Sequence, residues 1–143
     1  MNISKFTQKS VQAVQDLEKI AYEYGNQEIE EEHLLYALLT QEDSLILKLI
    51  EKMEIQKEYF IDTVKRALDA RVKVSGGELR FGQYLNKALV SAEDEAKAMG
   101  DEYVSVEHLF LSMLKNPSPS MKKLFNEFGI TRERFLQALS TVR

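Results

Sequence analysis

Apolar residues recur every three or four positions along most of this 143-residue chain, which is the spacing of amphipathic helices. The first stretch covers 6–24 and stops before Gly25, a residue that commonly ends a helix. Seven further stripes follow, at Leu34, Leu35, Leu38 and Leu39; Ile46, Leu49, Ile50 and Met53; Phe60, Ile61, Val64 and Leu68; Leu85, Ala88, Leu89, Ala92, Ala96 and Met99; Leu109, Phe110, Met113 and Leu114; Met121, Leu124, Phe125 and Phe128; and Phe135, Leu136 and Leu139. Strand-like alternation of apolar and polar positions is absent. The pattern predicts an all-α fold of about eight helices.

The second half of the chain repeats the first. A shift of 75 residues aligns 6–68 with 81–143 without a gap, and 15 of the 63 aligned pairs are identical. Unrelated segments of ordinary composition would share about four. Pro117 and Pro119 fall where the sixth helix should give way to the seventh, because proline can end or open a helix. Two copies of one four-helix unit explain this self-similarity.

We therefore expect a single domain over 1–143, built from two tandem repeats related by a pseudo-twofold axis. Repeat one covers 6–70 and repeat two covers 81–143. The segment between them, 71–80, has no counterpart in the alignment and contains a pair of glycines, so it is interpreted as the linker.

Charge and composition narrow the classes of partner. The net charge is −4 and acidic and basic residues are interspersed, which argues against nucleic acid or an anionic membrane surface. The absence of cysteine excludes disulfides, thiolate zinc sites and cysteine nucleophiles, and it suits a reducing compartment. No apolar run approaches the roughly 18 residues that a membrane span needs, and the chain begins directly with an amphipathic pattern. We expect a cytoplasmic protein.

Catalytic signatures are missing from the sequence. There is no phosphate-binding glycine loop, no metalloprotease histidine pair and no Gly-x-Ser-x-Gly elbow, so we expect no catalytic residue and no cofactor within this domain. The only histidines, His33 and His108, stand at matching repeat positions between a Glu and a Leu. They could be paired metal ligands, but a duplicated role at each helix start explains their duplication better, and no metal site is predicted. The methionines lie mostly on helical stripes, which favours core filling over a cofactor site.

Four glutamates lie within 28–32, just before the second helix. They could form a cation or acid/base site, although negative side chains at this place also stabilise a helix N-terminus. In repeat two, Ser105 is the expected N-cap and Glu107 lies in the first turn. Glu32 and Glu107 are therefore twins at helix starts, close to free backbone N–H groups.

A few apolar residues fall off the predicted core stripes, among them Tyr36, Val90 and Leu111. Single exposed apolar residues are normal in soluble proteins. Tyr36 and Leu111 are repeat twins, however, and a groove between the two copies would suit the apolar side chains of a partner peptide. These three residues are the predicted lining of an apolar groove.

The chain resembles the N-terminal domains of Clp-family AAA+ chaperones over essentially its whole length. The resemblance rests on Phe-Thr at 6–7 and on Glu-His-Leu opening the second helix of each repeat. It is strongest for the ClpB-type disaggregase branch, through the runs 25–29, 38–46, 73–77 and above all Met-Gly-Asp-Glu-Tyr-Val-Ser-Val-Glu-His-Leu-Phe at 99–110. Protease-linked relatives typically open this helix with Gly-Thr-Glu-His, which neither repeat has here.

This resemblance implies a substrate-binding domain that captures exposed apolar segments of unfolded or aggregated proteins. It further implies a longer protein with two ATP-hydrolysing modules, in a homohexameric ring that threads polypeptide through its pore. ATP and Mg, and contacts with a DnaK-type chaperone system, would then belong to other domains, and the isolated domain would be monomeric.

The same resemblance implies the residues that handle substrate. The family's polar residues with this role match Thr7, Asp101 and Glu107, and Glu32 joins them as the twin of Glu107. In protease-linked relatives the glutamates matching Glu32 and Glu107 recognise arginine-phosphorylated proteins, so an adaptor or phosphoarginine docking domain is the alternative. A domain that serves only ring regulation or structure is the third hypothesis.

Overall fold

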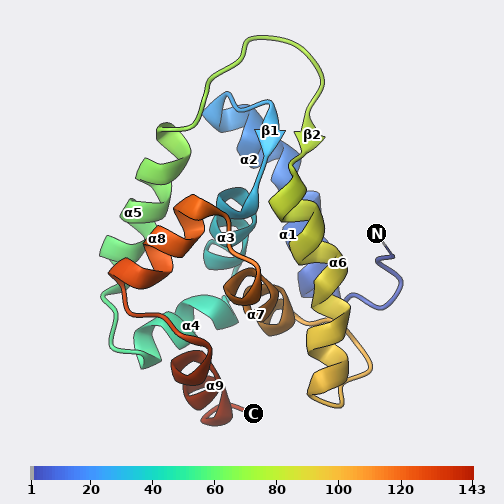
Figure 1. Ribbon diagram of the computed structural model, residues 1–143, viewed down its shortest axis with the longest axis vertical. Helices are drawn as coiled ribbons and strands as arrows, with labels where there is room; N and C mark the ends of the chain where they lie inside the picture. Colours follow the sequence, from blue (N-terminus) through green and yellow to red (C-terminus); the bar gives the residue numbers. More distant parts are fainter. Residues whose placement is uncertain (1) are drawn as a thin grey trace.

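The apolar stripes and their capping residues divide the chain into short helices, as the pattern predicts. The computed structural model describes residues 2–143, and its all-α fold confirms the predicted class (Figure 1). The helices are α1 (Gln8–Gln15), α2 (Leu17–Tyr24), α3 (Glu31–Leu39), α4 (Leu45–Lys52), α5 (Lys57–Asp69), α6 (Gln83–Ala98), α7 (Val106–Lys115), α8 (Pro119–Glu127) and α9 (Arg132–Ser140). No helix within residues 2–143 has both the length and the apolar character to cross a membrane.

The described chain has nine helices where eight are expected, because the first predicted helix is divided at Asp16. This residue keeps right-handed helical dihedrals, and its N–H still donates to the carbonyl of Gln12 at 3.0 Å. Its counterpart in repeat two lies inside α6, which runs unbroken for 16 residues. Aspartate is a weak helix former because its side chain competes for backbone groups, which is consistent with a break here.

Polar caps fix the helix starts. Thr7, Ser44, Ser118 and Thr131 each accept a hydrogen bond from the backbone N–H three residues ahead. Pro119 is the first residue of α8, in the position where a missing N–H costs nothing. The two prolines therefore mark the predicted boundary before α8.

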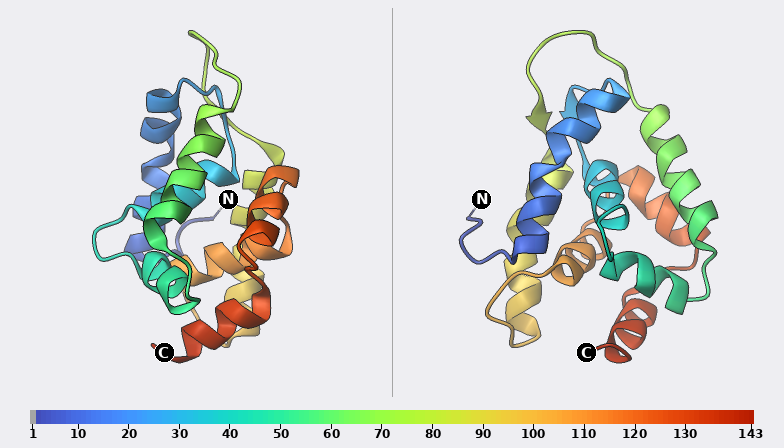
Figure 2. Two further views of the ribbon diagram at one scale, coloured as in Figure 1. Left: turned by 90° about the vertical axis from the view of Figure 1, so that its left-hand side faces the viewer. Right: turned by 180° about the vertical axis from the view of Figure 1, so that it is seen from behind.

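The core is continuous between the repeats. In Figure 1, α5 and α6 run along opposite sides and α3 and α7 fill the centre, an arrangement that the views in Figure 2 support. One cluster of buried apolar side chains includes residues of both repeats, and the ring of Phe60 in repeat one meets Phe128 of repeat two edge to face at 4.9 Å. Met53, Met113 and Met121 are buried and Met99 packs against the core partly buried, which confirms the core-filling interpretation of the methionines.

Two very short strand pairings link the repeats, and the sequence does not predict them. Strand β1 (Glu28–Ile29) pairs in parallel with β2 (Arg80–Phe81), and Phe6 forms a parallel bridge with Val104. The 75-residue shift carries Phe6 onto Phe81 and Ile29 onto Val104, so the two pairings are twins. The opening segment of each repeat is therefore hydrogen-bonded to the other repeat.

Candidate functional site

The two histidines hold the starts of α3 and α7. His33 Nδ1 accepts the N–H of Glu30 at 2.9 Å and its Nε2 lies 2.9 Å from Asn26 Oδ1. His108 repeats this geometry with the N–H of Ser105 at 2.8 Å and with Asp101 Oδ2 at 2.8 Å. An acceptor at Nδ1 and a donor at Nε2 describe a neutral imidazole. The prediction that each histidine supports its own helix start is confirmed.

Asp101 and Glu107 meet on one guanidinium. Arg143 donates from Nη2 to Asp101 Oδ1, and from Nη1 to Glu107 Oε2 at 3.1 Å. The hydrogen bond from Arg143 lowers the pKa of Asp101, a direction that favours the ionised carboxylate. Thr7 lies at the same edge of repeat two, because its N–H donates to the carbonyl of Val104 at 3.0 Å. The structure thus brings two of the predicted residues into direct contact with one cation and places the third nearby.

Glu32 has a matching arginine in repeat one. Its Oε2 accepts from Arg71 Nη1 at 2.9 Å and from the Ser120 hydroxyl at 3.0 Å. Arg71 also reaches Glu28 Oε1 at 3.2 Å. Each twin glutamate therefore faces an arginine that follows the last helix of its own repeat. Glu32 lies apart from the Asp101–Glu107 pair, on the side of the molecule that faces α5 and α8.

Three of the four glutamates, Glu30, Glu31 and Glu32, are buried and reach into repeat two. Glu30 Oε1 accepts the N–H of Leu85 at the start of α6, at 2.7 Å, and Glu31 Oε1 accepts the N–H of Ser118 at 2.7 Å. Burial raises the pKa of Glu30, and it raises that of Glu31 to about 8. The glutamates do stabilise helix starts, as expected. Glu30 and Glu31, however, accept N–H groups at helix starts of the other repeat. Within residues 2–143, no group of three or more acidic or histidine side chains is arranged to hold a metal ion.

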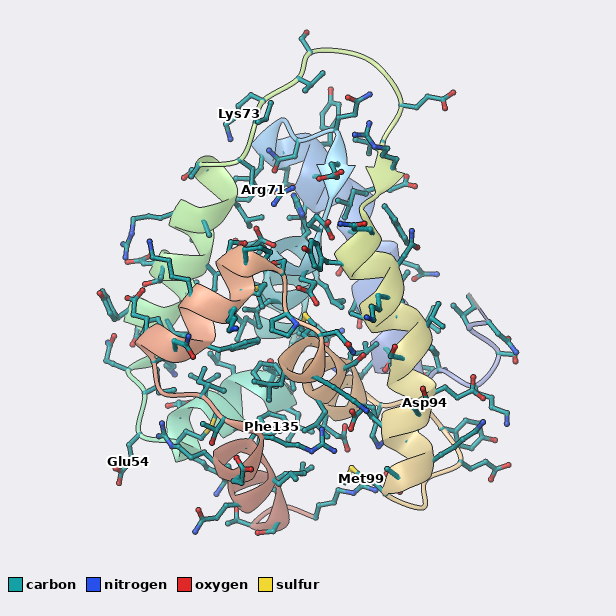
Figure 3. The ribbon with its side chains drawn as sticks, in the orientation of Figure 1. Glu54, Arg71, Lys73, Asp94, Met99 and Phe135 are labelled. Carbon is teal, nitrogen blue, oxygen red and sulfur yellow. The ribbon has the colours of Figure 1, made fainter. Side chains whose placement is uncertain are left out.

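A cleft of about 850 Å³ opens between α5, α8 and the linker. Figure 3 shows Arg71 below the linker where it leaves α5, and its guanidinium bonds to Glu32 in the first turn of α3. The lining combines small apolar side chains with charged groups of both signs: Gln27, Glu28, Glu32, Thr63, Arg66, Ala67, Ala70, Arg71, Val72, Val74, Arg80, Ser120, Lys123, Leu124 and Glu127. Of the four predicted polar site residues, only Glu32 lines it. An amphipathic ligand could bury apolar groups here beside paired charges.

The predicted apolar groove is not formed as expected. Leu111 is fully buried in the core, so the prediction that it lines an open groove is wrong. Its helix lies at the centre of the molecule and is covered on nearly all sides. Tyr36 is partly buried and meets Tyr24 edge to face at 6.0 Å, whereas Val90 is 63% exposed on α6. None of the three lines the cleft.

Sequence reasoning missed two kinds of residue around the glutamates. The first kind is Arg71 and Arg143, and the signal for them is their shared place just after the last helix of each repeat. The second kind is the apolar linker residues Val72 and Val74, which line the cleft and are exposed by 79% and 42%. Valines between charged residues in a glycine-containing linker were a signal that this segment could line a site as well as join the repeats.

Comparisons with known proteins identify similar chains. Residues 5–140 match the family model of the Clp repeat N-terminal domain. The whole chain is 40% identical over 149 residues to chaperone protein ClpB of Nitratidesulfovibrio vulgaris, and 39% identical over 148 residues to chaperone protein ClpB of Clostridium tetani. The chain spans 17% of the length of each of these relatives.

Solved structures share the fold at low sequence identity. The Hsp104 N-terminal domain from Candida albicans superposes with a TM-score of 0.80 at 21% identity, covering 94% of this chain and 89% of that one. A ClpV N-domain in complex with a VipB peptide superposes with a TM-score of 0.72 at 22% identity, covering 96% of this chain and 89% of that one.

Proposed function

Because this chain belongs to the Clp repeat N-terminal domain family, we propose that it is the substrate-binding domain of an ATP-dependent protein disaggregase. The observation that carries the proposal is the match of the entire chain to ClpB chaperones at up to 40% identity. The domain captures exposed apolar segments of unfolded or aggregated polypeptides. Capture is weak and tolerant of sequence, because an adaptable apolar surface gains little from fixed polar contacts.

The remaining activities belong to parts of the protein outside this chain, which covers 17% of the curated relatives' length. Under the proposal, ATP and Mg bind to two AAA+ modules of a cytoplasmic homohexamer, which threads the captured chain through its pore. A DnaK-type chaperone system acts with those modules. The domain of residues 1–143 hydrolyses no ATP, holds no cofactor and is monomeric when isolated.

Thr7, Asp101, Glu107 and Glu32 serve as the polar groups that orient the captured chain. The support for this role is their geometry. Asp101 and Glu107 share Arg143. Asp101 is nevertheless partly accessible, with 22% of its side chain exposed. A main-chain N–H or a basic side chain of a captured polypeptide could compete with Arg143 for these carboxylates.

Titration of the labelled domain with one model protein, in folded and unfolded forms, tests the proposal by NMR. We expect fast, weak binding of the unfolded form and almost none of the folded form. Asp101→Ala and Glu107→Ala should weaken binding by more than their loss of stability explains, because Asp101 also holds Nε2 of the buried His108. Glu18→Ala is the control, because it removes an exposed carboxylate of α2 that is not one of the four proposed residues. Equal shifts from folded and unfolded protein would overturn apolar capture.

The second candidate is docking of arginine-phosphorylated proteins or of an adaptor of a protease-linked unfoldase. One observation favours it: Glu32 Oε1 is buried without a hydrogen-bond partner, in a cleft that also presents Arg66 and Lys123. A carboxylate and nearby cations match the two ends of a phosphoguanidinium group. Calorimetry with a phosphoarginine peptide and its unphosphorylated form separates the candidates, since only docking requires the phosphate. A domain that binds none of these ligands would leave ring regulation as its role.

A further inference from the structure

Three successive carboxylates at the start of α3 face the other repeat. Glu30 reaches the first turn of α6, Glu31 reaches Ser118, and Glu32 reaches Ser120 in the first turn of α8. These bonds span 55, 87 and 88 residues of sequence. Repeat two makes no equivalent contact to repeat one, because the position that matches Glu31 is Val106. The joint between α3 and α8 is therefore polar on one side of the pseudo-twofold axis only.

Two oxygens at this joint lack partners. Glu31 Oε2 and Glu32 Oε1 are both buried and neither has a hydrogen-bond partner. Glu31 is fully buried and Glu32 is 2% exposed. A buried carboxylate oxygen without a donor is costly when the group is ionised. A proton on Glu31 would remove one of two adjacent negative charges and turn the partnerless oxygen into a hydroxyl.

The charges around Glu31 point the same way. Its own helix start presents Glu30 and Glu32, and both raise the pKa of Glu31 further after burial has done so, to about 8 in total. Arg71 of the linker is bound to Glu32 and Glu28. From α8 and the loop before it, Glu31 meets the N–H and hydroxyl of Ser118, which oppose the shift without cancelling it.

We propose that Glu31 is a protonated lock between the repeats, and that its ionisation releases the first turn of α8 from α3. In the locked form Oε1 holds the N–H of Ser118, the N-cap of α8, and Oε2 carries the proton. Ionisation places an uncompensated negative charge in the buried contact between α3 and α8. When the first turn of α8 moves away from α3, water enters and solvates this charge. The rest of α8 stays anchored by Leu124 and Phe125 in the core.

The lock acts on the cleft between α5 and α8. Ser120, Lys123 and Leu124 of α8 line that cleft, so lifting the first turn widens it at the end where Glu32 lies. Release also breaks the bond from the Ser120 hydroxyl to Glu32. The device is a property of the domain itself and does not depend on polypeptide capture.

Amide hydrogen exchange of the intact domain tests the lock. Met121 donates its N–H to Ser118 Oγ at 3.3 Å, and Leu47 makes the corresponding bond to Ser44 Oγ at 3.1 Å in repeat one, where the neighbouring carboxylate, Asp43, is exposed and paired with Lys48. The raised pKa works against the closed form as pH rises from the usual glutamate value toward about 8. After correction for intrinsic exchange, protection of Met121 should therefore fall by up to about tenfold per pH unit in this window and level off above it. Protection of Leu47 should not respond.

Glu31→Gln mimics the protonated side chain and should abolish the response of Met121. A second measurement needs no variant: the side-chain carboxyl carbon of Glu31 should titrate by NMR well above the usual range of glutamate. A midpoint within the ordinary glutamate range would overturn the proposal. Equal pH responses at Met121 and Leu47, or an unchanged response in Glu31→Gln, would do so as well.

Discussion

Exchanging the two capping arrangements tests how the repeats are joined. Helix α6 begins after Gly82, which has no side chain for capping, and Glu30 of the other repeat supplies the acceptor instead. Helix α1 begins after Thr7, which caps itself, and Ser105 stands where repeat one has Glu30. The double variant Glu30→Ser with Gly82→Thr would give α6 the arrangement that α1 already has.

Each single change should be destabilising for a different reason. Glu30→Ser removes the acceptor for Leu85 and should cost about 0.5–2 kcal/mol, the usual value of a lost N-cap. A Cβ at Gly82 would lie 2.2 Å from Glu30 Oε2, so Gly82→Thr must displace a buried carboxylate and should cost about 1–3 kcal/mol. In the double variant the clash is gone and the threonine supplies the cap, so its stability should return to within about 1 kcal/mol of the natural chain.

Urea unfolding followed by circular dichroism gives the free energies of the natural chain and the three variants. The expected result is a favourable coupling free energy of about 1–3 kcal/mol between the two substitutions. Costs that simply add, within about 0.5 kcal/mol, would refute the claim that the Glu30 carboxylate stands in for a cap that Gly82 lacks.

Other predictions use the same repeat symmetry. Glu54 and Gly129 match and both have left-handed dihedrals, with φ of 64° and 62°, so Glu54→Gly should stabilise and Gly129→Ala should destabilise the domain by about 1 kcal/mol each in urea unfolding. Leu111→Ala should cost about 2–5 kcal/mol, and Val90→Ala less than about 0.5 kcal/mol; similar costs would contradict their assigned burial. Burial lowers the pKa of His33 to about 4, so its contribution is present above the usual histidine pKa and is lost as pH falls through about 4. His33→Gln should flatten that acid loss, which is at most about 1.4 kcal/mol per pH unit.

The helices were predictable because their signal is local. Apolar spacing and capping residues lie within one helix, so eight stripes, the helix end at Gly25 and the helix start at Pro119 could be placed from sequence. The role of His33 was predictable for the same reason, since its partners lie within seven residues. The division at Asp16 was not predicted, because the break between α1 and α2 is a single residue whose dihedral angles remain helical.

The joints between the repeats were not predictable, because their partners are far apart in sequence. Glu31 was expected to favour its own helix start, and nothing near it indicated the N–H of Ser118, 87 residues away. Leu111 was expected at the surface because the apolar-stripe reasoning assumes that every helix has one solvent-exposed face. Helix α7 is central and has almost none, so residues off its stripe are buried as well.

The exchanged pairings of Phe6 with Val104 and of Ile29 with Phe81 bear on how such a domain could arise. A lone repeat would leave both its opening segment and its short strand without a hydrogen-bonding partner. Two copies of that repeat, placed about the twofold axis, would satisfy each other through the same contacts. An ancestral single-repeat protein with this fold would therefore have been an intertwined homodimer. Fusion of two such genes through the linker would fix the two partners in one polypeptide and would leave Gly82 and Glu30 free to diverge from Thr7 and Ser105.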